Sequence, residues 1–68
     1  MKRKIIKFTD KVENKEMELL IGSIGQHIYR LTNQVSETND AIRWCNSHKV
    51  GDTFDCDKYS MEIKEIEL

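Results

Sequence analysis

The sequence predicts an α+β fold, a small antiparallel sheet of two to four strands with two helices packed on one face. Three observations support it: a helical stripe of apolar residues near the middle, strand-like alternation at both ends, and a second amphipathic segment between them. With 68 residues the chain forms a single domain, residues 1–68. At about 100° per residue, the stripe falls within a window roughly 100° wide. It consists of Met17, Leu20, Ile21, Ile24, Ile28, Leu31 and Val35.

The N-terminal segment predicts a strand over Lys4–Phe8, with Ile6 and Phe8 on one face. A polar, turn-like segment follows at residues 10–14. The favoured interpretation of the stripe is one helix from about residue 15 to about residue 34, capped by Asn14. Glu16 and Glu18 would then occupy its first turn, where carboxylates favour the positive end of the helix dipole.

A β-hairpin is the alternative for the same region. Gly22 and Gly25 lie inside the predicted helix, and each costs it about 1 kcal/mol relative to alanine. In the alternative, residues 5–12 pair with residues 16–21 across a turn at residues 13–15. The helix would then begin only near Ser23 or Gln26.

A second helix is predicted after a break at residues 35–40, with Ser36 or Thr38 as its cap, and it runs to about Lys49. Its buried face contains Ala41, Ile42 and Cys45. Gly51 after it suits a left-handed conformation.

The C-terminal segment alternates apolar and polar residues and predicts a last strand that pairs with the first. A hairpin turned at residues 55–58 is one option, and the altered phase after Ile63 indicates a bulge or a frayed end. The predicted core consists of Ile6, Phe8, Leu20, Ile21, Ile24, Ile28, Leu31, Ile42, Cys45, Phe54, Tyr59, Met61 and Ile63.

Composition limits the function classes. Hydrophobic residues make up 38% and charged residues 34%, and the formal net charge is −1, so no global field attracts nucleic acid or an anionic membrane. No secretory signal and no membrane span are recognisable, so we expect a cytoplasmic protein whose two cysteines are free thiols. Charge is uneven along the chain, because residues 1–11 are basic and residues 52–68 are acidic.

Few side chains suggest chemistry. His27, Cys45, His48 and Cys56 form one candidate Cys₂His₂ zinc set, although no Cys-x₂-Cys knuckle is present and core packing explains the cysteines better. Cys45 and His48 could form a thiol–base pair, but a chain of this length has little room to enclose a substrate. We therefore expect no enzyme, no catalytic residue, no metal and no cofactor.

The function predicted is a non-enzymatic protein-interaction module, an inhibitor or modulator that occupies a partner's surface, as small phage or mobile-element accessory proteins do. Exposed Trp, Tyr and Arg are enriched in binding hot spots. The predicted partner-binding residues are Trp44, Arg43, Tyr29, Arg30, Asp55 and Asp57. Self-association is also expected, because a core this small leaves apolar surface to cover.

The alternative function is a small nucleic-acid-binding regulator. It would use the basic N-terminal segment, where lysine and arginine could neutralise phosphates. The candidate residues are Lys2, Arg3, Lys4 and Lys7.

Overall fold

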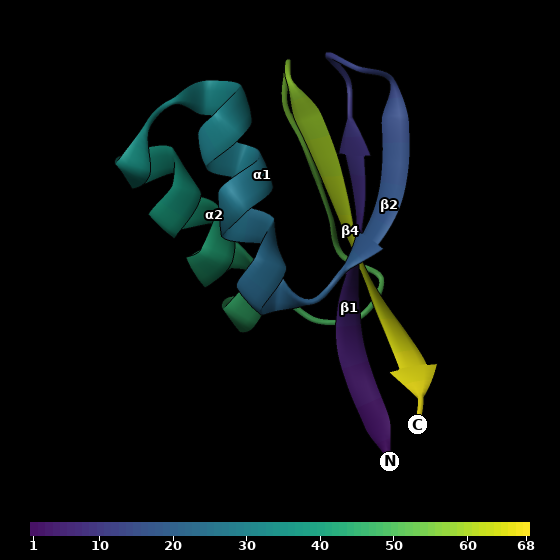
Figure 1. Ribbon diagram of the computed structural model, residues 1–68. Helices are drawn as coiled ribbons and strands as arrows, with labels where there is room; N and C mark the ends of the chain where they lie inside the picture. The colour runs from purple at the N-terminus through teal and green to yellow at the C-terminus, as the bar shows by residue number, and fades with distance from the viewer.

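The structure is a computed structural model that describes residues 1–68. Four strands form one antiparallel sheet in the order β2-β1-β4-β3, and two helices cover one of its faces, which confirms the predicted α+β class (Figure 1). In chain order the elements are β1 (Lys2–Asp10), β2 (Lys15–Leu19), α1 (Ile21–Thr32), α2 (Val35–Ser47), β3 (Thr53–Asp55) and β4 (Tyr59–Glu67). No helix is long and apolar enough to cross a membrane.

The favoured single helix over residues 15–34 is wrong, and the alternative hairpin is confirmed with different bounds. β2 pairs with β1 from Ile6↔Leu19 to Asp10↔Lys15, so the turn lies at residues 11–14 and not 13–15. α1 begins at Ile21, slightly before the predicted Ser23 or Gln26. Met17 and Leu19 alternate with glutamates, so the segment also has the period of a strand with one covered face. A helix here would have buried Leu20, which is instead 41% exposed.

The turn between β1 and β2 explains what Asn14 does. Its φ of 58° is left-handed, a conformation that asparagine tolerates better than most residues, so Asn14 serves the hairpin and caps no helix. Inside the turn, one carboxylate oxygen of Asp10 accepts the amide hydrogens of Val12 at 2.9 Å and Glu13 at 3.0 Å.

The two helices are separated only by Asn33 and Gln34. Asn33 ends α1 in a left-handed conformation with φ of 55°, and its amide donates to the Tyr29 carbonyl. The predicted caps of α2 are wrong. Its N-cap is Gln34 without a side-chain bond, and the Thr38 hydroxyl donates to the Gln34 carbonyl at 2.9 Å.

The central pair of the sheet is β1 and β4, as predicted from the two ends of the chain, and it runs from Lys2↔Glu67 to Asp10↔Tyr59. This ladder continues past Ile63 without a bulge, and the Leu68 amide still donates to the Met1 carbonyl at 2.7 Å. The changed phase therefore reflects Ile66 on the sheet face opposite the helices. The hairpin predicted with a turn at residues 55–58 forms between β3 and β4, with its turn at residues 56–58 because Asp55 still belongs to β3. The left-handed Gly51, with φ of 97°, is confirmed.

Most of the predicted core is buried between sheet and helices. Leu20 is the error in the predicted core, because it lies exposed at the junction of β2 and α1. Ile21, Leu31, Ile42 and Phe54 are half-buried against the core. The predicted core also omitted three buried residues, Asp10, Ile5 and Ala41. Ile5 lies on the sheet face away from the helices. The core cluster consists of Ile6, Phe8, Ile24, Ile28, Ala41, Cys45, Tyr59, Met61 and Ile63.

Candidate functional site

The most apolar concavity of the protein lies between α2 and the β3–β4 hairpin. Its volume is about 380 Å³, which falls in the range of small-molecule and side-chain binding pockets. We call it the Trp44 pocket. The residues that line it are Glu37, Asp40, Ala41, Trp44, Phe54, Cys56 and Tyr59.

The helix supplies one wall because four of these residues recur with helical spacing. Glu37, Asp40, Ala41 and Trp44 are separated by three, one and three residues, so they share one face of α2. Ala41 is 4% exposed and contributes only a methyl group, so it leaves space between the helix and the sheet. One turn later, the Cys45 thiol lies 3.9 Å from the Met61 sulfur of β4 and holds α2 against the sheet.

Aromatic rings form the floor of the pocket. The centroids of Trp44 and Phe54 are 5.7 Å apart with planes tilted by 58°, and those of Phe54 and Tyr59 are 5.9 Å apart. Tyr59 in turn stacks on Phe8 of β1 at 5.6 Å, and His48 stacks on Trp44 at 4.6 Å. The exposed rings are therefore fixed by rings of the core, which lowers the entropy lost when they bind a ligand.

The charged residues lining the Trp44 pocket are both acidic. Asp40 pairs with Arg43 one turn along the helix, whereas Glu37 forms no ion pair. A smaller concavity of about 220 Å³ adjoins the pocket, shares Glu37, Cys56 and Tyr59 with it, and adds Asp57 and Lys58 to the lining. The rim therefore presents the unpaired carboxylates of Glu37 and Asp57 beside an aromatic floor, and its one cation, Lys58, donates to the Leu31 carbonyl at 3.1 Å.

Burial raises the pKa of the tyrosine in this floor. The pKa of Tyr59 rises from 10.0 to about 12, first because the ring is removed from water and then through the nearby Cys56 and Glu37. The hydroxyl is a hydrogen-bond donor at neutral pH already at its ordinary pKa, and the raised pKa keeps it protonated further into the alkaline range.

Of the residues predicted to bind a partner, Trp44 lines the Trp44 pocket and Asp57 lines the adjoining concavity. Arg43 is exposed beside the pocket and pairs with Asp40. Asp55 forms an ion pair with Lys11 at 2.6 Å, and it lies outside both concavities.

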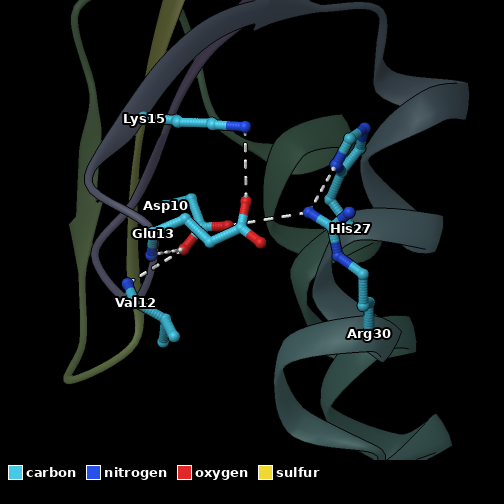
Figure 2. A network of polar contacts seen from close by, with 6 residues as sticks. All are labelled: Asp10, Val12, Glu13, Lys15, His27 and Arg30. Atoms are coloured by element: carbon cyan, nitrogen blue, oxygen red, sulfur yellow. Dashed lines mark hydrogen bonds and ion pairs between the residues drawn. The ribbon is translucent and has the colours of Figure 1, made fainter.

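Tyr29 and Arg30 belong to another surface, on α1. Tyr29 is 47% exposed and does not line the pocket. One Arg30 nitrogen lies 3.6 Å from the second carboxylate oxygen of Asp10 and 3.5 Å from the His27 Nδ1 (Figure 2). Arg30 thus connects α1 to the β1–β2 turn.

The candidate zinc set is not brought together, since no three His, Cys, Asp or Glu side chains lie close enough to hold a metal ion. The Cys45–His48 pair does not form either. Burial raises the pKa of Cys45 to about 11, although Lys4 nearby lowers it. The His48 ring stacks on Trp44, and its Nδ1 lies 2.9 Å from the Trp44 carbonyl.

The basic N-terminal residues are divided between the two faces of β1. The Lys4 ammonium donates to the carbonyls of Cys45 and His48 at the C-terminal end of α2, where cations are favoured. Lys7 lies on the opposite face and pairs with Glu16 at 3.1 Å, an interaction that raises its pKa. Lys2 pairs with Glu65 at 3.6 Å. Only Arg3 of the set forms neither an ion pair nor a side-chain bond to a backbone carbonyl.

Of the pocket residues, the sequence predicted only Trp44 and missed Glu37, Asp40, Ala41, Phe54, Cys56 and Tyr59. The shared helical face of Glu37, Asp40 and Trp44 is a signal in the sequence. The position of the β3–β4 hairpin opposite that face carries no such signal, because it depends on the order of strands in the sheet.

Comparison with known proteins finds no matching family model, no matching curated protein and no matching solved structure.

Proposed function

We propose that the protein is a non-enzymatic interaction module of the cytoplasm that binds a partner protein through the Trp44 pocket. The observation that carries the proposal is the half-buried Trp44 over an aromatic floor, in the most apolar concavity of the surface. Large aromatic side chains held in place beside a pocket are typical of interface hot spots. An inhibitor or modulator that occupies a partner's surface would place such an anchor near the centre of its interface.

The Cys45–His48 geometry agrees with a binding role. A thiol with a pKa near 11 is protonated at neutral pH, and the histidine beside it in sequence stacks on Trp44. Nucleic-acid binding through Lys2, Arg3, Lys4 and Lys7 has less support, because three of these side chains already contact carboxylates or backbone carbonyls.

The test is affinity capture from lysate of the native host, with wild-type protein and two variants as baits. We expect Trp44→Ala to lose a partner that wild type retains, because truncation of a central anchor costs about 2 kcal/mol or more of binding free energy. Tyr29→Ala removes an exposed aromatic residue from the other helix and is the matched control. A partner that binds Trp44→Ala as well as wild type would contradict the proposal.

A further inference from the structure

We infer that the Trp44 pocket receives a cationic side chain, an arginine or lysine flanked by apolar residues in an exposed segment of the partner protein. The inference rests on the proposed function and adds the chemistry of the bound residue.

The negative charge of the pocket lining favours a cationic ligand. Glu37 and Asp40 are the charged residues lining the pocket, and Glu37 has no cation of its own chain as a partner. Glu37 also contributes to the raised pKa of Tyr59, so its field reaches the floor of the pocket. An anionic or neutral ligand would leave this carboxylate uncompensated when the interface excludes water, whereas a guanidinium would pair with it.

The aromatic rings of the pocket floor also favour a cation. Trp44, Phe54 and Tyr59 line one concavity, with successive centroids 5.7 Å and 5.9 Å apart. A cation within about 6 Å of an aromatic centroid is attracted by the ring's quadrupole, and tryptophan gives the strongest attraction. Arginine suits this combination best, because its planar group stacks on a ring and still donates to a carboxylate.

The apolar flanks follow from the rest of the lining. The remaining lining residues are Ala41, which contributes a methyl group, and the half-buried Cys56. An apolar neighbour of the cation would cover these groups, whereas a continuous run of charged residues would not. The expected segment of the partner is therefore one arginine or lysine with apolar residues on both sides.

A pair of blocked peptides tests the inference. Acetyl-Gly-Leu-Arg-Leu-Gly-amide is compared with the same peptide carrying citrulline, which keeps the shape of arginine without its charge. Binding is followed by the fluorescence of Trp44, the single tryptophan, and by amide chemical shifts across α2 and β3. We expect the arginine peptide to shift resonances around the pocket and to bind about tenfold more tightly than the citrulline peptide.

Two protein variants locate the charge. Glu37→Gln should weaken the arginine peptide several-fold and leave the citrulline peptide unchanged. Glu18→Gln removes an exposed carboxylate from β2, on the sheet face away from the helices, and should change neither. Thermal melts of both variants establish that they are folded.

Three results would overturn the inference: equal affinity for the two peptides, no shift at the pocket with either at millimolar concentration, or equal effects of Glu37→Gln and Glu18→Gln. If pocket resonances instead shift as the protein alone is concentrated, the occupant is a second copy, and the separate basic partner is excluded. The host-lysate capture is independent of these measurements. A partner that requires Trp44 but tolerates Glu37→Gln would retain the proposed function and refute only the cationic anchor.

Discussion

Asp10 is the one fully buried charged residue, and it organises the hairpin at the start of the chain. One of its oxygens accepts two amide hydrogens of the turn, while the other is buried without a hydrogen bond and faces Arg30 at 3.6 Å (Figure 2). The carboxylate therefore joins β1, the β1–β2 turn and α1. The sequence pattern placed Asp10 at the start of a polar, turn-like segment over residues 10–14, and its burial was not predicted because aspartate is mostly exposed.

Asp10→Ala should lower the free energy of unfolding by about 1–3 kcal/mol, because two turn amides lose their acceptor. Asp10→Asn keeps an acceptor for those amides but loses the attraction to Arg30, so it should cost less. Urea denaturation measures both. Asp57→Asn, at an exposed position, is the control and should stay within about 0.5 kcal/mol of wild type. An equally small change in Asp10→Ala would contradict the role assigned to this carboxylate.

At the scale of elements, the segment from Met17 to Leu20 shows why local patterns are ambiguous. Its apolar residues fit a helical stripe with Ile24 and Ile28, yet Met17 and Leu19 also fit the covered face of a strand. Tertiary pairing selects the strand over the helix for this segment, because β2 pairs with the edge of β1 over Ile6–Asp10. The sequence therefore predicted the β1–β2 pairing only as the alternative to a helix, whereas the β1–β4 pair was predictable from strand-like patterns at both chain ends.

The glycines of α1 have different surroundings. A Cβ at Gly22 would meet nothing within 4 Å, whereas a Cβ at Gly25 would lie 3.3 Å from the Ile42 Cδ1 and 3.5 Å from the Thr38 methyl. Gly25 therefore lets α2 approach α1 closely.

Gly22→Ala should stabilise the protein by about 0.4–1 kcal/mol, because alanine restricts the unfolded chain and fits the helix. Gly25→Ala should gain less or destabilise, since Ile42 must move. Thermal unfolding compares the two, and the Ile42→Val background, which lacks the Cδ1 atom, should restore part of the gain at residue 25. A larger gain from Gly25→Ala than from Gly22→Ala would contradict the close approach.

At the scale of the whole molecule, the chain is as compact as a folded monomer of its mass. Its accessible surface is 4567 Å², and a protein of 8.0 kDa is expected to expose about 4,450 Å². The fold class was predictable because it follows from the number and type of amphipathic segments. The pocket was predictable only through Trp44, because its other wall is a hairpin whose place depends on the strand order.

Two buried groups make global stability sensitive to alkali. Burial raises the pKa of Cys45 from its ordinary 9.0 to about 11 and that of Tyr59 from 10.0 to about 12. The folded protein holds both protons more tightly than the unfolded chain. The contribution of each group to the free energy of unfolding is therefore fully present below pH 9, and it is lost as pH rises through about 11 for Cys45 and about 12 for Tyr59.

The free energy of unfolding, measured with urea, should fall between pH 9 and pH 12. Tyr59→Phe should reduce the fall by up to about 2–3 kcal/mol, because a phenylalanine has no proton to lose. Tyr29→Phe removes an exposed tyrosine and should leave the fall in place. If the free energy of unfolding of Tyr59→Phe falls with pH as steeply as that of wild type, the Tyr59 hydroxyl is not shielded from water.

The pairing of Met1 with Leu68 has a practical consequence. Both extremities emerge side by side beyond the helices (Figure 1), while Tyr59, at the other end of β4, reaches the Trp44 pocket. Nine residues of strand separate the termini from Tyr59, a span of about 30 Å. The Trp44 side of the pocket lies nearer, because the Lys4 ammonium contacts the carbonyls of Cys45 and His48. A fluorophore, a biotin or a fused protein attached at either terminus would therefore stand clear of the Tyr59 end of the pocket, and a flexible linker would keep it away from Trp44.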